Sequence, residues 1–258
     1  MNTIKVYDGP SLIDGQRIIV LVTGLKKKSS NTKTGDMLQT WIMRYDIAPH
    51  NALKTGDDSS VCGKCPLRPL HHTRSKLYPE PCYVTVFQAP LSTWKANKDL
   101  PVAEPEKVLE IIDGRKVRRG SYGDPMAVPV SVWQMLDNGE KPTGYSHQWK
   151  KGADLSAYVM ASVHTSEERA QAKSKGYRTF RIIADVSEIE TGEILCPASK
   201  EAGVRTTCAK CGLCNGSKAV VSQQDFIDGN FPASWKMGAD FSVDWTRDKR
   251  KDIAIVAH

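Results

Sequence analysis

The pattern of apolar and polar positions divides the chain into a strand-rich N-terminal part and a longer part in which strands and helices alternate. Residues Arg17–Val22 form an apolar run that is typical of a buried strand, and Gln39–Tyr45 predicts a second strand. The polar stretch Thr23–Asp36 between them indicates a long loop, so the two strands are expected to pair as a β-hairpin. A loop or a short helix is expected over Ala48–Ser60.

From Cys82 onward, strands alternate with helices. Strands are expected at Tyr83–Phe87, Lys116–Arg119, Thr143–Trp149, Ala157–Val163, Arg178–Ala184 and Ile253–Val256. Helices are expected at Leu91–Lys98, at Glu104–Ile112 with Pro105 near its start, at Val130–Leu136, and at Glu167–Lys175 between a cap at Thr165 or Ser166 and Gly176. Such alternation is typical of right-handed βαβ units and predicts parallel strands.

The expected fold class is therefore α/β. The strands are too few for a closed eight-stranded barrel, so we expect either a partial (β/α) barrel or an open, mainly parallel sheet, with the N-terminal β-hairpin and two cysteine-rich metal-binding loops. Residues 1–61 carry the first strands and a basic loop, 62–195 the α/β core, and 196–258 the second cysteine region and the closing strand. We expect these segments to form one compact unit.

Composition adds expectations about location and partners. No apolar run of about 18 residues occurs, and the N-terminus lacks an apolar signal segment, so we expect a soluble cytoplasmic protein without a membrane partner. The net charge of +7 favours polyanions, and nucleic acid or nucleotides are candidate partners, although a basic surface without a partner fits equally well. Lys26, Lys27, Lys28 and Lys33 share one polar loop, which can bind phosphates or simply be solvated.

The chain contains seven cysteines, an odd number that cannot pair completely as disulfides, and cytosolic thiols stay reduced. Four of them form one set with the spacing Cys196-x11-Cys208-x2-Cys211-x2-Cys214. Thiolates two residues apart can turn toward one centre, and the small residues Ala209, Gly212 and Gly216 allow the backbone to approach closely. Four thiolates complete either a [4Fe-4S] cluster, in which the C-x2-C-x2-C run is commoner, or a zinc site.

The other three cysteines, Cys62-x2-Cys65-x16-Cys82, lie in a loop rich in proline and basic residues. A histidine between them, His71 or His72, can supply a fourth ligand to zinc. Alternatively, three thiolates on a four-iron cluster leave one iron open to a substrate or cofactor. A third reading is that one of the three is an ordinary buried cysteine.

A further candidate is the segment GSYGDP, which follows an expected strand and precedes a helix. Tyr122, Gly123 and Asp124 are candidate cofactor-binding residues, because loops at the carboxyl ends of parallel strands face the usual ligand site. The plainer reading is a turn in which Asp124 caps the next helix. His147 ends an expected strand and either faces the same pocket or is an ordinary core or surface histidine. The chain contains no P-loop and no G-x-S-x-G elbow, which disfavours the two enzyme classes that they mark.

Several segments resemble a family of phage and prophage proteins of uncharacterised function: YGDP, TGYSHQW, YVMASVHTSEERAQAKSKGYRTFRI, CPASKEAGVRTTCAKCGLCNG and IAIVAH. The resemblance covers about residues 34–258 and implies location in the host cytoplasm. The order of elements is also remotely similar to a shortened radical S-adenosylmethionine core, although the usual C-x3-C-x2-C spacing is absent. This resemblance implies an open cluster on Cys62, Cys65 and Cys82, an auxiliary cluster on the other four cysteines, and S-adenosylmethionine at Tyr122, Gly123 and Asp124.

Two main hypotheses follow. The first is a phage-type iron–sulfur enzyme of the radical S-adenosylmethionine kind, acting on nucleic acid, a nucleotide or a protein. The alternative is a non-catalytic nucleic-acid-binding protein with structural zinc or iron–sulfur sites. A third reading is a protein that binds a host partner through the irregular, basic insert Val220–Lys251.

Overall fold

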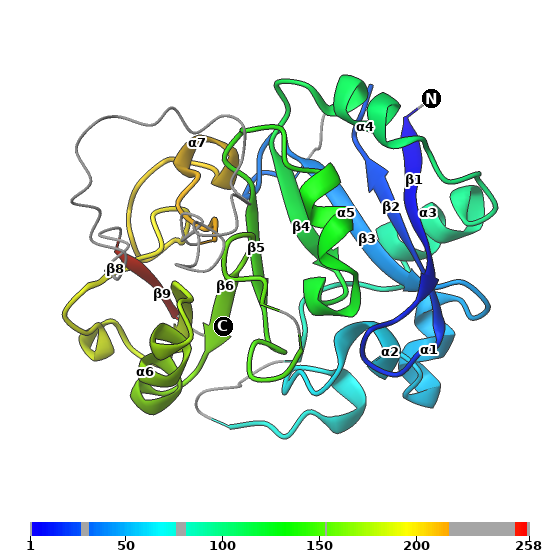
Figure 1. Cartoon of the computed structure of the whole chain (residues 1–258). Coiled ribbons are helices and arrows are strands. Elements are labelled where there is room, and N and C mark those ends of the chain that lie inside the picture. The colour runs from blue at the N-terminus through cyan, green and yellow to red at the C-terminus, as the bar shows by residue number, and fades with distance from the viewer. Residues whose placement is uncertain (1, 27–30, 76–80, 153, 217–250, 257–258) are drawn as a thin grey trace, which may run out of the picture.

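The computed structural model describes residues 2–26, 31–75, 81–152, 154–216 and 251–256. Their strands form one open, nine-stranded sheet with the order β1-β2-β3-β4-β5-β6-β7-β9-β8 (Figure 1). The α/β class and the open, mainly parallel sheet are thus confirmed. Of the residues named above, Lys27, Lys28 and the insert Val220–Lys251 except Lys251 lie outside the described residues.

The first three strands are antiparallel. β2 (Arg17–Thr23) pairs with β3 (Leu38–Arg44), which confirms the expected hairpin, and β1 (Thr3–Pro10) adds an outer strand that the sequence analysis missed. The apolar side chains Ile4 and Val6 of β1 alternate into the core. All five central residues of β2 are buried, as its continuous apolar run predicted.

The remaining strands run parallel to β3 and to one another. They are β4 (Val117–Tyr122), β5 (Thr143–Ser146), β6 (Met160–Val163), β7 (Thr179–Ile183), β9 (Asp252–Val256) and β8 (Glu193–Leu195). β8 was not expected from the sequence. The last described strand, β9, lies between β7 and β8, so these two strands are joined in the sheet by a segment that comes after both in the sequence.

Four helices lie near the positions expected for them, two lie in or next to the segment expected to be a loop or a short helix, and the helical turn at Cys208–Cys211 was not expected. They are α1 (Pro49–Thr55), α2 (Ser59–Cys62), α3 (Ala89–Asn97), α4 (Pro105–Ile112), α5 (Val130–Met135), α6 (Ser166–Ser174) and α7 (Cys208–Cys211). Thr165 caps α6 by accepting a hydrogen bond from the Glu168 N–H, and Gly176 follows its end with φ of 81°, as predicted. No described helix is long and apolar enough to cross a membrane.

The expected strand at Tyr83–Phe87 is wrong, because the segment forms coil and a turn that leads into α3. Val86 is buried, whereas Tyr83 and Phe87 are 69% and 66% exposed. The apolar alternation is therefore real, but the segment packs its valines on the core without pairing with a neighbouring strand. Inward and outward alternation alone does not require a ladder of hydrogen bonds.

The pairing of β3 with β4 contains a register shift, which changes the course of β4 toward its carboxyl end. The register with β3 slips after Gln39, so that Trp41 faces Tyr122. Thr40 fills the gap: its hydroxyl donates to the Arg118 carbonyl at 2.9 Å and accepts from the Gly120 N–H at 2.8 Å. Bulges of this kind bend a strand and re-aim its side chains, and they are frequent beside functional sites.

Candidate metal centres

The first cysteine set is brought together by local turns. Cys62 ends α2, and Gly63 then adopts a positive φ of 57°; a Cβ there would lie 2.4 Å from the Gln148 side chain. The Cys65 N–H donates to the Cys62 carbonyl at 3.2 Å, and the Cys82 N–H donates to the Leu67 carbonyl at 2.8 Å. The long loop therefore returns Cys82 to the other two cysteines.

A buried arginine clamps this loop. The Arg68 guanidinium binds both Asp58 carboxylate oxygens, with N–O distances of 2.9 and 2.5 Å, and the two side chains are only 9% and 2% exposed. Its remaining donors reach the carbonyls of Gly63 at 3.1 Å and Gly56 at 2.8 Å. One side chain thus satisfies the backbone on both sides of α2 and fixes the base of the first cysteine loop.

The loop docks at the carboxyl ends of β4 and β5. The Asp124 N–H, just after β4, donates to the Val61 carbonyl at 2.6 Å. The Gln148 side chain, just after β5, donates to the Cys62 carbonyl and accepts from the Lys64 N–H, both at 3.2 Å. The first set therefore lies at the edge where ligands usually bind in open parallel sheets.

The three thiols of the first set lie within electrostatic range of one another. Burial raises the pKa of Cys62, and Asp58, Cys65 and Cys82 raise it further. Burial raises the pKa of Cys65 to about 12, and Cys82 adds to this shift. Without a cation, three buried thiols in this position keep their protons, whereas a bound metal favours the thiolates.

The second set is built around the single helical turn α7. Thr207 caps it by accepting from the Lys210 N–H at 3.3 Å, and Gly212 ends it with φ of 61°. Cys208 and Cys211 are three residues apart on this turn and therefore share one face. The Cys214 carbonyl then accepts from the Gly144 N–H at 2.9 Å, which ties the turn to β5.

Contacts from four distant segments hold the second set in place. The N–H groups of Cys208 and Ala209 donate to the carbonyls of Lys33 and Thr34, and the Lys116 ammonium donates to the Ala209 carbonyl at 2.7 Å. The buried Arg178 guanidinium donates to the carbonyls on either side of Cys214, those of Leu213 and Asn215, at 2.7 and 2.9 Å. The Cys196 N–H donates to the Ala254 carbonyl at 2.8 Å. A Cβ on Gly216 would lie 2.4 Å from the Ala157 backbone, so close approach there requires glycine, as the sequence suggested.

The four thiols of the second set also influence one another. Burial raises the pKa of Cys214, and Cys196, Cys208 and Cys211 each raise it further. Burial likewise raises the pKa of Cys208 and of Cys196, an effect that Lys33 opposes at both. The thiols thus influence one another within two groups, and metal binding by either group stays a prediction.

Main-chain N–H groups point at several of these sulfur atoms. The N–H groups of Leu67, Val84 and Ala198 donate to the sulfur atoms of Cys65, Cys82 and Cys196, and each such bond lowers the pKa of its thiol. These three donors stand two residues after their cysteines, and the Ser199 N–H is a further donor to Cys196. Hydrogen bonds of this kind stabilise the thiolate, which is the form that binds metal.

The donor set can be compared with what a metal requires. All seven cysteines are free thiols. Within the described residues, no three His, Cys, Asp or Glu side chains meet in an arrangement that holds a metal ion as it stands. The grouped, reduced sulfur donors nevertheless fit a thiophilic metal in chemical type. The buried Tyr122 hydroxyl has no hydrogen-bond partner, and its pKa is raised by burial and then by Cys62, so it faces the first set unsatisfied.

The candidate cofactor loop lies beside this first set. Gly123 has φ of 82°, and a Cβ on it would lie 2.6 Å from the Ile42 Cβ, so glycine is required. Asp124 is buried, and its carboxylate accepts from the Met126 N–H, the Ser146 hydroxyl and the His147 N–H at 3.0, 2.6 and 2.8 Å. Burial raises the pKa of Asp124 to about 6 against these hydrogen bonds. Asp124 thus caps the turn Pro125–Ala127, as the plainer reading held. Of the three candidate cofactor-binding residues, Tyr122 has the buried hydroxyl that lacks a hydrogen-bond partner.

The candidate histidines and lysines are distributed more widely. His147 stacks on His164 with ring centroids 5.6 Å apart at the ends of β5 and β6. Burial lowers the pKa of His147 to about 3 and that of His164 to about 4. Lys33 lies beside the second set, whereas Lys26 is exposed and its N–H binds the Asn2 side chain. The side chain of His71 lies outside the described part of the chain, so a fourth ligand from His71 or His72 stays a prediction.

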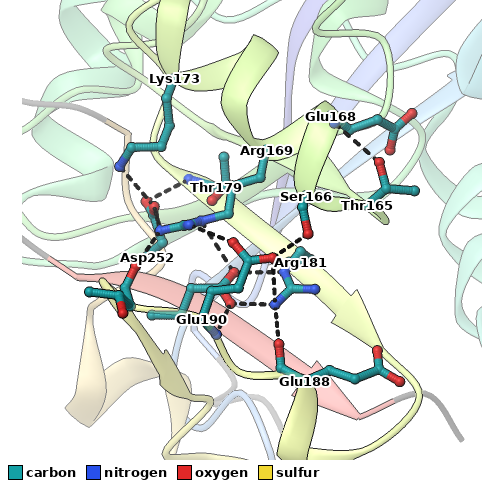
Figure 2. Close-up of polar contacts among 12 residues, drawn as sticks. Thr165, Ser166, Glu168, Arg169, Lys173, Thr179, Arg181, Glu188, Glu190 and Asp252 are labelled. Carbon is teal, nitrogen blue, oxygen red and sulfur yellow. Dashed lines mark hydrogen bonds and ion pairs between the residues drawn. The ribbon is translucent and has the colours of Figure 1, made fainter.

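An ion cluster positions the strand that presents Cys196. Figure 2 shows Arg169, Lys173 and Arg181 near Asp252 of β9 and Glu190 of the loop before β8. Asp252, 1% exposed, accepts from Arg169 at 3.1 Å, Lys173 at 3.0 Å and the Thr179 N–H at 3.0 Å. The Arg181 guanidinium binds both oxygens of Glu193. Because each of these three cations has a carboxylate partner, we interpret the cluster as structural ion pairs that hold α6, β7, β8 and β9 together.

Sequence reasoning missed the residues that position both sets. Arg68, Gln148 and Arg178 carry no spacing signal: the partners of Arg68 lie 5–12 residues away, and those of Gln148 and Arg178 lie 35 or more residues away. Comparison of the chain with protein-family models, curated proteins and solved structures gave no match. The argument for function therefore depends on the two cysteine sets.

Proposed function

We propose that the chain is a two-centre iron–sulfur protein. In this proposal Cys62, Cys65 and Cys82 hold one [4Fe-4S] cluster, and Cys196, Cys208, Cys211 and Cys214 hold the other. The observation that carries it is the division of seven reduced thiols into two groups, with main-chain N–H groups donating to three of the sulfur atoms. The C-x2-C-x2-C spacing of the second set favours iron–sulfur over zinc.

Three thiolates leave one iron of the first cluster open to a further ligand. We propose that this position takes S-adenosylmethionine or the substrate itself, in a phage-type enzyme that acts on nucleic acid, a nucleotide or a protein. An iron of this kind supplies an electron to the molecule bound on it. Tyr122 supports the assignment, because its buried hydroxyl faces the first set without a partner. Gly123 allows the chain to turn beside the site, and Asp124 holds that turn in place.

Anaerobic reconstitution with iron and sulfide tests the metal assignment. The full chain should take up about eight iron atoms and show the broad absorbance of such clusters near 400 nm. Cys65→Ser and Cys211→Ser form a matched pair, since each should lose one centre and retain the other. Wild-type protein that binds no iron would refute the iron assignment, and iron content unchanged in both variants would refute the ligand assignment.

The chemistry requires a separate measurement. Reduced, iron-loaded protein should cleave S-adenosylmethionine to 5′-deoxyadenosine and methionine, and Cys65→Ser should abolish the reaction while Cys211→Ser retains the first centre. If iron-loaded protein leaves S-adenosylmethionine intact, the cofactor assignment is refuted while the iron–sulfur assignment stands.

The alternative is a non-catalytic nucleic-acid-binding protein with structural metal sites. The +7 charge, the exposed Lys26 and the exposed aromatic residues Tyr83 and Phe87 favour it, because cations with aromatic faces suit a single-stranded nucleic acid. About two zinc ions per chain without iron, together with nucleic-acid affinity that falls steeply as salt rises, would select this function. Weak affinity with little salt dependence would exclude it.

A further inference from the structure

The side chain of Arg119 lies on the face of β4 opposite to the segments that carry the cysteine sets. On the near face, Lys116 donates to the Ala209 carbonyl and Arg118 donates to the Tyr83 hydroxyl. Successive residues of a strand alternate between the two faces of a sheet, so Arg119 points the other way. Arg119 is only 2% exposed, and its charge is therefore buried in the other layer of the fold.

Two neighbours hold this guanidinium, and they leave part of it unsatisfied. Arg119 pairs in register with Gly144 of β5, where a Cβ would lie 2.9 Å from the Arg119 Cβ, so the glycine makes room for the arginine. Its Nη1 donates to the Tyr158 carbonyl at 2.7 Å, and the Tyr158 ring centroid lies 5.1 Å from its Cζ. Among the described residues, neither Nε nor Nη2 of Arg119 has a hydrogen-bond partner. Burying charged N–H groups without acceptors destabilises the folded chain.

The two unsatisfied nitrogens form the edge of a guanidinium that binds both oxygens of one carboxylate. Elsewhere in the chain Nε and Nη2 together bind an aspartate or a glutamate: Arg17 binds Asp8, Arg44 binds Asp46, Arg68 binds Asp58 and Arg181 binds Glu193. Arg178 is also buried without a carboxylate, but both of its terminal nitrogens donate to main-chain carbonyls. Arg119 differs from these five, because its complete carboxylate-binding edge is buried with no acceptor in the described part of the chain.

We propose that the Nε–Nη2 edge of Arg119 binds the carboxylate group of a small molecule. A carboxylate accepts from both N–H groups at once and neutralises the buried charge. A phosphate brings more negative charge into a site that already lies within electrostatic range of Asp137, so a singly charged group fits better. Neither cysteine set contributes to this site, and the inference therefore does not depend on the proposed function.

The site borders solvent on the side of Tyr158. The Tyr158 side chain is partly buried, and its hydroxyl bonds to the side chain of Gln134, an exposed residue of α5. Asp137, just after the same helix, is exposed as well. A ligand therefore reaches Arg119 when the Tyr158 ring moves, without any change in the sheet.

Nuclear magnetic resonance of the reduced full chain, labelled with nitrogen-15 arginine, observes each buried Nε–H group directly. Titration with sodium acetate, at an ionic strength held constant with sodium chloride, should move the Arg119 signal downfield and saturate, with half of the effect at about 1–10 mM. The Nε–H groups of Arg68 and Arg181 already donate to carboxylates, so their signals are internal controls and should stay in place. Inorganic phosphate should need at least about three times the acetate concentration for the same shift.

Two variants assign the signal and supply a second readout. Arg119→Met removes the signal and replaces an unpaired buried charge by an apolar side chain, and Tyr158→Leu shifts the signal by removing the ring. At ten times the half-saturating concentration, acetate should raise the thermal midpoint of wild type by about 3–6 °C relative to chloride, and that of Arg119→Met by less than about 1 °C.

Three results would overturn the inference. The first is an Arg119 signal that does not move in up to about 100 mM acetate, ten times the upper half-saturation expected. The second is an equal shift of the Arg119, Arg68 and Arg181 signals, which is a general effect of salt. The third is phosphate acting at a lower concentration than acetate, which excludes a carboxylate as the preferred group. None of these results bears on the metal assignment, because the measurement needs no metal.

Discussion

Replacing Arg68 by methionine tests whether the buried clamp stabilises the first cysteine loop. The substitution leaves the Asp58 carboxylate, 2% exposed, without its cation, and it leaves the Gly56 and Gly63 carbonyls without the guanidinium donors. Removing one partner of a buried ion pair typically costs about 3–5 kcal/mol. We expect a loss of about 4 kcal/mol, which is a large part of the stability of an ordinary domain.

The chain supplies a matched control for this measurement. Arg17 also binds both oxygens of an aspartate, Asp8, at 2.8 and 3.1 Å, but its side chain is 55% exposed. Its guanidinium also stacks on the Tyr45 ring at 3.6 Å. Solvent screens an exposed pair strongly, so Arg17→Met should cost only a small fraction of the loss in Arg68→Met, with the stacking included.

Urea unfolding of the metal-free, reduced full chain, followed by tryptophan fluorescence, measures both losses. With a slope of about 2–3 kcal/mol per molar urea, Arg68→Met should lower the midpoint by about 1.5 M and Arg17→Met by less than about 0.5 M. The double variant Asp58→Leu with Arg68→Met should be more stable than Arg68→Met alone, because no charge is then left buried. Equal losses in Arg68→Met and Arg17→Met would refute the reasoning from burial.

Three further predictions concern other parts of the fold. Asp252→Ala removes the acceptor shared by two cations and a main-chain N–H, so thermal unfolding should reveal a loss of about 3–5 kcal/mol, whereas a loss below 1 kcal/mol would show that water replaces it. Gly123→Ala should cost more than about 2 kcal/mol, because its Cβ meets backbone and side-chain atoms at positive φ; Gly114→Ala, also at positive φ but in open space, should cost about 1 kcal/mol, and equal costs would contradict the steric argument. Burial lowers the pKa values of His147 and His164 to about 3 and 4, so between pH 6.5 and about 4 only the unfolded chain binds these protons. The free energy of unfolding should therefore fall on acidification, by about 2 kcal/mol per histidine at pH 5. Urea unfolding from pH 7 to 5 measures this fall, and His147→Phe should make it smaller.

Much of the fold could be predicted where a strand is a continuous apolar run, as in β2 and β9, whereas β4 (VRRGSY) and β5 (TGYS) contain few apolar residues. β1 was missed since its apolar residues are interrupted by Lys5, which is itself buried and paired with Asp8 at 2.9 Å. β8 has only three residues and carries no periodic signal. The segment after Cys82 was misread, because its buried valines contact the core without a strand partner.

The site divides in the same way. Cysteine spacing predicts two sets of metal ligands, since two-residue spacings act locally through tight turns, and metal binding at either set stays a prediction. The orientation of those turns depends on Arg68, Arg178 and Gln148, whose partners lie at distances along the chain that no motif fixes.

The position of β9 in the sheet determines when, during translation, each cysteine set can be assembled. The Cys196 N–H donates to the Ala254 carbonyl, and among the described strands β8 pairs only with β9. Before β9 is synthesised, Cys196 and β8 therefore lack the strand that they bind. Every described element that positions the three-cysteine set has already been translated by then. If both sets bind metal as proposed, loading during translation should begin at the first set, and the second should mature only after β9 (Asp252–Val256) has been made.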